Sequence, residues 1–123
     1  MGAKKTIMII EDNPLNMKLT AELLRIGGFD LIKAVDGKSA FEILRQTIPD
    51  LIVLDLQLPD IDGFEVMKKI RSDEKTKTIK VVAVTASVMK EDEEQVAEAG
   101  FDGYIAKPIN TREFVKQIKA ILG

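Results

Sequence analysis

Short apolar runs alternate with longer amphipathic stretches along the whole chain. Five runs rich in Ile, Leu and Val predict strands at residues 7–10, 31–35, 51–54, 81–84 and 104–106. The first, third and fourth runs are almost continuously apolar, which indicates strands that are buried on both faces, as in a parallel sheet. The alternation therefore predicts an α/β fold made of five βα units.

The stretches between these runs predict helices with recognisable ends. Asn13 followed by Pro14 predicts the start of the first helix, and Gly27-Gly28 predicts its end. Asp36 predicts a cap for a second helix at about 37–47. One side of the first helix is expected to carry its large apolar residues, which are Leu15, Leu19, Leu23 and Ile26.

Three more helices complete the pattern. Asp62 predicts a cap for a helix at about 63–73, and an acidic helix is expected at about 89–99, before Gly100. Asn110 and Glu113, in capping-box spacing, predict the start of the last helix. The residues that this helix is expected to turn inward are Phe114, Ile118, Ile121 and Leu122.

Length and composition narrow the class of protein. With 123 residues, 46% of them hydrophobic and 31% charged, the chain is expected to form one globular domain, spanning residues 1–123, with no output domain. The net charge of −2 offers no basic stripe, so direct nucleic-acid binding is not expected. No apolar run approaches the ~20 residues of a membrane span, and a cytoplasmic location without membrane contact is expected.

The absence of two residue types excludes several kinds of chemistry. The chain has no cysteine and no histidine. A thiol nucleophile, a serine triad with its histidine base and an ordinary zinc site are therefore all disfavoured.

The remaining reactive side chains follow the predicted strands. Glu11 and Asp12 follow the first strand, Asp55 the third, Thr85 the fourth and Lys107 the fifth. Because ligands bind beyond the carboxyl ends of parallel strands, these residues are expected to meet at one rim. Three carboxylates favour a hard cation with oxygen ligands, best Mg²⁺, and a carboxylate can itself act as the nucleophile in phosphoryl transfer.

Five short motifs in this order resemble the response-regulator receiver family. They are Ile9-Ile10-Glu11-Asp12-Asn13, Leu54-Asp55-Leu56-Gln57-Leu58-Pro59, Asp62-Gly63, Val84-Thr85-Ala86 and Lys107-Pro108. Within the family, the chain most resembles the single-domain cell-division regulators. The resemblance implies a flavodoxin-like (βα)5 doubly wound sheet of five parallel strands in the order 2-1-3-4-5, with helices on both faces.

The resemblance also implies roles for individual residues. Asp55 would accept a phosphoryl group from phosphohistidine on a sensor histidine kinase or phosphotransfer protein, and Lys107 would hold a phosphoryl oxygen. Thr85 and Tyr104 would form the switch, and the Lys107–Pro108 bond would be cis. Mg²⁺, or Mn²⁺ in its place, would be held by Asp12, Asp55 and the Gln57 carbonyl, with Glu11 acting through water.

The resemblance also implies that the chain signals by binding other proteins. The donor-facing surface is expected to include Asn13, Leu15, Asn16, Leu19 and Pro108. The surface of the fourth helix, fifth strand and fifth helix would contact a downstream protein, with the chain a monomer or weak dimer. Such a chain would not be a classical enzyme, since it would catalyse only its own phosphorylation and dephosphorylation.

Two other functions compete with this interpretation. A phosphatase of the haloacid dehalogenase type would also use Asp55 as nucleophile, but it needs a second aspartate where this chain has Gln57. A receiver-like module that has lost its chemistry would not need the complete set of reactive residues. Asp60-Ile61-Asp62-Gly63 resembles the start of a calcium loop, but the glutamate that ends such a loop is missing.

Overall fold

The computed structural model describes residues 4–86 and 90–123. Its strands are β1 (Thr6–Ile10), β2 (Asp30–Ala34), β3 (Leu51–Asp55), β4 (Lys80–Thr85) and β5 (Gly103–Ala106). Its helices are α1 (Pro14–Ile26), α2 (Gly37–Leu44), α3 (Gly63–Ser72), α4 (Lys90–Glu98) and α5 (Phe114–Leu122). Each predicted strand and helix is present. Met89, with which the fourth helix was expected to begin, lies outside the described residues.

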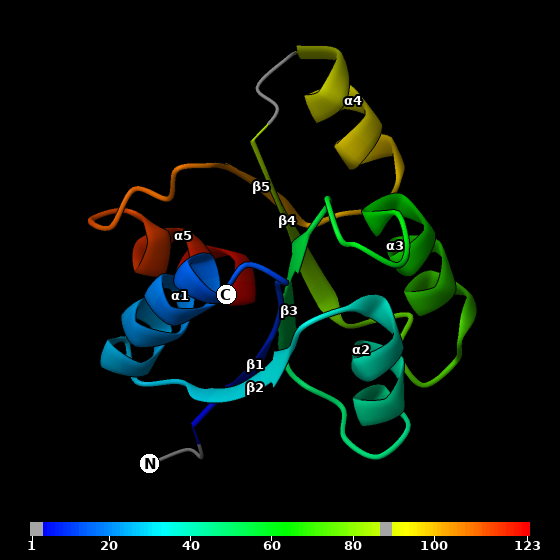
Figure 1. The fold of residues 1–123 in the computed structure, drawn as a ribbon, viewed down its shortest axis with the longest axis horizontal. Helices are drawn as coiled ribbons and strands as arrows, with labels where there is room; N and C mark the ends of the chain where they lie inside the picture. Colours follow the sequence, from blue (N-terminus) through cyan, green and yellow to red (C-terminus); the bar gives the residue numbers. More distant parts are fainter. Residues whose placement is uncertain (1–3, 87–89) are drawn as a thin grey trace.

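The strands form one parallel sheet in the order β2-β1-β3-β4-β5, which confirms the predicted fold class. Helices α1 and α5 cover one face, and α2, α3 and α4 cover the other (Figure 1). The register pairs Ile10 with Leu54, Asp55 with Val84, and Thr85 with Ala106. The ends of the four strands β1, β3, β4 and β5 therefore open onto one rim.

Two apolar layers hold the helices against the sheet. Alternate residues of each central strand point to opposite faces, so Met8 and Ile10 contribute to one layer and Ile7 and Ile9 to the other. Every residue of β3 is buried: the apolar run 51–54, as predicted, and also Asp55 at its end. None of the helices in the described ranges is long and apolar enough to cross a membrane.

Helix α1 does not bury the side that carries its large apolar residues. The residues that this helix buries are Met17, Thr20, Ala21 and Leu24. Leu15 is 78% exposed and Ile26 is 76% exposed, while Leu19 is also exposed and Leu23 is only half-buried. Thr20 and Ala21 are small, so the helix axis can lie close to the sheet on this side.

The ends of three other elements differ from the prediction. Helix α2 ends at Leu44 rather than near residue 47, and β2 ends at Ala34, which leaves Val35 exposed. Helix α5 begins at Phe114 instead of directly after Asn110. The Asn110 side chain accepts from the backbone N–H of Arg112 and Glu113, so it caps a separate turn before the helix.

One arginine joins three segments on the α3 side of the sheet. Arg71 donates to the carbonyl oxygens of Lys77 and Ile79 at 3.0 and 2.6 Å, and to that of Gly100 at 3.0 Å. It also pairs with Asp102 at 3.0 Å. The guanidinium thus ties the end of α3 to the segments that precede β4 and β5.

Candidate active site at the carboxyl ends of the strands

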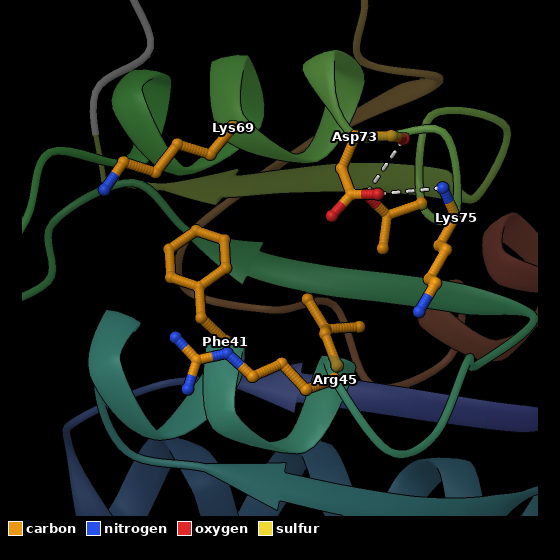
Figure 2. A pocket seen from close by; sticks show the side chains of 7 residues that line it. Phe41, Arg45, Lys69, Asp73 and Lys75 are labelled. Carbon is orange, nitrogen blue, oxygen red and sulfur yellow. Dashed lines mark hydrogen bonds between the residues drawn. The ribbon is translucent and has the colours of Figure 1, made fainter.

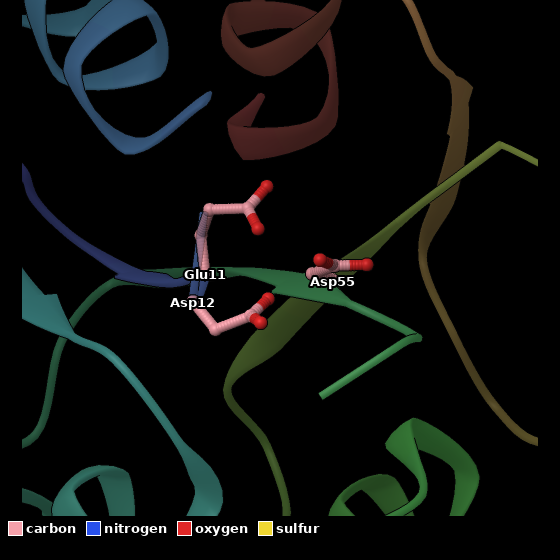
Figure 3. A group of neighbouring side chains, drawn as sticks. All are labelled: Glu11, Asp12 and Asp55. Atoms are coloured by element: carbon pink, nitrogen blue, oxygen red, sulfur yellow. The ribbon is translucent and has the colours of Figure 1, made fainter. Parts of the chain in front are cut away.

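Three carboxylates lie together where β1 and β3 end (Figure 3). Oxygens of Glu11, Asp12 and Asp55 lie within 4.8 Å of one another. Glu11 is 5% exposed and Asp55 is 3% exposed, whereas Asp12 is exposed to solvent. Two acids of the cluster are therefore held in the protein and the third faces water.

Lys107 brings a positive charge to this cluster from the end of β5. Its Nζ lies 3.0 Å from Glu11 Oε1 and 3.1 Å from Asp55 Oδ2. The backbone N–H of Lys107 donates to the Thr85 carbonyl oxygen at 2.8 Å, which fixes the lysine beside the end of β4. The ammonium thus bridges the two buried carboxylates.

Burial and neighbouring charge change the acidity of Glu11. Burial, together with the Asp55 carboxyl group beside it, raises the pKa of Glu11 to about 7 from an ordinary 4.5. The hydrogen bonds from Lys107 and from the backbone N–H of Asn13 act in the opposite direction but do not cancel this effect. A second negative charge in the pocket is therefore costly near neutral pH.

Lys107 keeps its positive charge because two carboxylates lie beside it. Burial alone would lower the pKa of Lys107, but its hydrogen bonds and charge interactions with Glu11 and Asp55 outweigh burial and raise the pKa above 10.5. The lysine is therefore an ammonium group at neutral pH. It neutralises one of the three carboxylates.

The cluster fits a hard divalent cation by the chemistry of its donors. Three carboxylate oxygens at short mutual distance, one of them solvent-exposed, suit a small cation that keeps part of its water shell. Backbone groups orient two of the acids: Asn13 N–H donates to Glu11 at 3.2 Å, and Gln57 N–H donates to Asp55 at 3.0 Å. The role of the Gln57 carbonyl stays a prediction.

The loop after Asp55 is closed at its base. The N–H of Gly63 donates to the Leu56 carbonyl at 3.2 Å, and Gln57 forms an antiparallel bridge with Asp62. A Cβ atom on Gly63 would lie 2.6 Å from the Cα of Leu56, so only glycine permits this approach. The Asp62-Gly63 motif therefore positions the chain that leaves the site, and Asp62 caps α3 as predicted.

Asp60 has a structural role that the sequence analysis missed. Its two carboxylate oxygens accept the backbone N–H groups of Gly37 and Lys38 at 2.9 and 3.0 Å, at the start of α2. The hydrogen bond from Gly37 is the main reason why the pKa of Asp60 lies below its usual value. Since the partners are 23 and 22 residues apart, no local pattern signals this contact.

Thr85 and Pro108 lie on the same rim, and Tyr104 lies further back in β5, where it pairs with Ala83. Thr85 is buried at the end of β4. Tyr104 in β5 is half-buried and packs against the apolar layer under α2, α3 and α4. Pro108 is exposed, and the Lys107–Pro108 peptide bond is cis, as the resemblance implies. The rim therefore brings together the five strand-end residues that the sequence analysis selected.

A family model described as the response regulator receiver domain matches residues 7–119. The chain belongs to this family. The receiver is 44% identical to the polar-differentiation response regulator DivK of Brucella ovis over 119 residues, which is 97% of each chain. The suspected likeness to single-domain cell-division regulators is thus confirmed, and the receiver family consists of signalling switches rather than classical enzymes.

Solved structures support the same relationship. The receiver domain of sensor histidine kinase PA1611 from Pseudomonas aeruginosa has a TM-score of 0.88 and 30% identity, over 98% of this chain and 99% of that one. That structure has a magnesium ion coordinated in its active site cleft. The Mn(2+)-bound form of response regulator Rcp1 has a TM-score of 0.80 and 32% identity, over 95% and 91% of the two chains.

Proposed function

We propose that the receiver accepts a phosphoryl group on Asp55 from phosphohistidine, with the help of Mg²⁺, and signals by protein contact. The observation that carries this proposal is the Lys107 ammonium between Glu11 and Asp55, at the end of a buried central strand. An Asp55 oxygen would form a bond to phosphorus while the P–N bond to the donor imidazole breaks. The electron pair of that bond returns to the imidazole nitrogen.

Lys107 and the metal would balance charge during transfer. A phosphoryl group adds about −1.5 to −2 charges at neutral pH beside acids that already repel one another. Lys107 can hold one phosphoryl oxygen without leaving the pocket, because its Nζ already lies 3.1 Å from Asp55. Asp12, Asp55 and the Gln57 carbonyl would hold Mg²⁺, with Glu11 acting through water. Bound Mg²⁺, or Mn²⁺, would supply positive charge for the transferring oxygens.

Thr85 and Tyr104 would report the modification to the surface. Val84 pairs with Asp55 in the sheet. Thr85 is the next residue along β4, so it lies one residue beyond the position opposite Asp55. Tyr104 pairs with Ala83 on the neighbouring strand. In the proposed switch, both side chains move toward the phosphorylated site and change the surface formed by α4, β5 and α5.

A kinase or phosphotransfer protein would dock beside the acidic cluster. Asn13, Leu15 and Leu19 are exposed at the start of α1, which follows Glu11 and Asp12 directly. Pro108 is exposed next to Lys107. Asn16 lies on the same turn of α1 as Leu15 and is half-buried. An apolar contact with Leu15 and Leu19 would place the donor imidazole over the rim.

Intact mass spectrometry after incubation with phosphoramidate and Mg²⁺ tests the chemistry, because this small donor also carries a P–N bond. The wild type should gain one phosphoryl group, and Asp55→Asn should gain none. Asp62→Asn is the matched control, because it makes the same change in the same loop and should still be modified.

Two results would contradict the proposal. One is equal modification of Asp55→Asn and the wild type. The other is repeated hydrolysis of a phosphate ester without a stable adduct, as a phosphatase would give.

A further inference from the structure

A cavity lies far from the acidic cluster, between α2, α3 and the loop that follows α3 (Figure 2). Its volume is about 400 Å³, within the ~300–1,000 Å³ range of small-molecule sites. The lining loop precedes β4, so the cavity lies at the amino ends of the strands, whereas Asp55 and Thr85 lie at the carboxyl ends. The phosphoryl chemistry proposed above does not use it.

The inner wall of the cavity is formed by Phe41, Leu44 and Thr76, and its other lining groups are charged. Phe41 is half-buried and Leu44 is buried, both on α2. Thr76 is buried as well, but its hydroxyl group donates to the Ile70 carbonyl at 2.7 Å and is therefore already satisfied. The wall thus offers a ring and an aliphatic side chain to a ligand.

Three cations border this wall. Arg45 on α2, Lys69 on α3 and Lys75 on the loop line the cavity from different sides (Figure 2). None of the ion pairs in the described part of the chain involves them. Lys69 Nζ lies 5.4 Å from the centre of the Phe41 ring, which keeps positive charge close to the apolar wall.

Asp73 is the only carboxylate among the lining residues, so the lining carries three positive charges and one negative charge. Its Oδ1 accepts the backbone N–H of Lys75 at 2.9 Å, which holds the loop in shape. The lining therefore favours a negatively charged ligand. A flat apolar part of that ligand would lie on the side of Phe41 and Leu44.

We propose that this cavity binds a small organic phosphate with a planar ring, of the nucleoside phosphate class. The ring would pack against Phe41 and Leu44, and the phosphate would accept hydrogen bonds from Arg45 and Lys75. The planar guanidinium of Arg45 suits a phosphate group because it can donate two parallel hydrogen bonds. The site would give the receiver a second input that is independent of phosphorylation at Asp55.

Titration of ¹⁵N-labelled receiver with adenosine 5′-monophosphate, without Mg²⁺, tests the proposal by the backbone amide resonances. Saturable shifts are expected at residues 41–45 and 73–76. Arg45→Gln/Lys75→Gln should weaken binding roughly tenfold per cation removed. Arg112→Gln/Lys116→Gln removes the same two kinds of cation from the exposed part of the α5 region and should leave binding unchanged.

Asp73→Asn provides a variant with the opposite effect. It removes the negative charge of the lining but keeps an oxygen that can accept the Lys75 N–H, so it should tighten binding. Adenosine and inorganic phosphate, each with half of the ligand chemistry, should bind more weakly than the nucleotide. The proposal is overturned if the nucleotide causes no shifts, or shifts only at Asp55 and Lys107. It is also overturned if inorganic phosphate binds as tightly as the nucleotide, or if Arg112→Gln/Lys116→Gln weakens binding as much as Arg45→Gln/Lys75→Gln.

Discussion

Glu11 and Asp12 are neighbours in the sequence but behave differently in the fold. Glu11 is buried beside Asp55 and Lys107, and Asp12 is exposed. Burial raises the pKa of Glu11 to about 7. The sequence predicted that both acids belong to the site, because both follow a strand, but no pattern in it shows which of them loses contact with water.

The raised pKa of Glu11 predicts a pH-dependent stability. The folded state binds this proton more tightly than the unfolded state, whose pKa is near 4.5. The contribution of this proton to the free energy of unfolding is therefore fully present below about pH 4.5 and is lost as the pH rises toward 7. Without Mg²⁺, Glu11→Gln should therefore exceed the wild type in free energy of unfolding at pH 8 by about 1–3 kcal/mol, measured in urea.

Glu22→Gln is the control for this experiment. Glu22 is exposed, and its hydrogen bond with Arg25 lowers its pKa instead of raising it. The variant should therefore show no gain in stability between pH 5 and pH 8 relative to the wild type. A Glu11→Gln protein that is less stable than the wild type at pH 8 would show that the carboxylate stabilises the pocket as an anion.

At the scale of single elements, α1 shows a limit of sequence patterns. Leu15, Leu19, Leu23 and Ile26 follow helical spacing, and so do the buried residues Met17, Thr20, Ala21 and Leu24. Both stripes satisfy the periodicity. The space between the helix and the sheet selects the stripe with smaller residues, and that space is set by residues of other elements.

A pair of substitutions in α1 tests which face is buried. Ala21→Leu adds volume to a packed layer and should lower the free energy of unfolding by about 1–3 kcal/mol. Leu15→Ala removes an exposed side chain and should change it by less than about 0.5 kcal/mol. Thermal or urea unfolding measures both. Equal losses in the two variants would contradict the observed orientation.

Arg71 connects elements that are distant in sequence. Four acceptors surround its guanidinium, including three backbone carbonyl oxygens. Arg71→Gln should lower the free energy of unfolding by about 2–4 kcal/mol, because several acceptors lose a charged donor at once. The free energy of unfolding of Arg71→Lys should lie between those of the wild type and Arg71→Gln, since an ammonium cannot reach all of the acceptors. Urea unfolding measures the series, with exposed Arg112→Gln as the unaffected control.

For the whole molecule, the sequence was sufficient for the class of fold. Five buried or half-buried strands separated by helices leave few ways to cover both faces of a parallel sheet, and right-handed crossovers reduce them further. Contacts between segments that are distant in the sequence, such as those of Asp60 with Gly37 and of Arg71 with Gly100, could not be predicted. They depend on the relative positions of elements that only the complete fold defines.

Divalent metal should stabilise the whole receiver. Bound Mg²⁺ would relieve repulsion among Glu11, Asp12 and Asp55, so the folded state should gain about 2.7 kcal/mol when free Mg²⁺ is 100 times its dissociation constant. The thermal midpoint should rise with Mg²⁺ and return after chelation. Asp12→Asn/Asp55→Asn should show a much smaller rise, and an equal rise would place the metal elsewhere.

The hydrogen bonds between Asp60 and the first turn of α2 have a consequence for protein engineering. The loop that leaves Asp55 also supplies the carboxylate that caps a helix 22 residues earlier in the chain. A chimera that imports a loop without an acid at this position would leave the N–H groups of Gly37 and Lys38 without their acceptor. Grafts should therefore exchange the loop and the opening residues of α2 as one cassette.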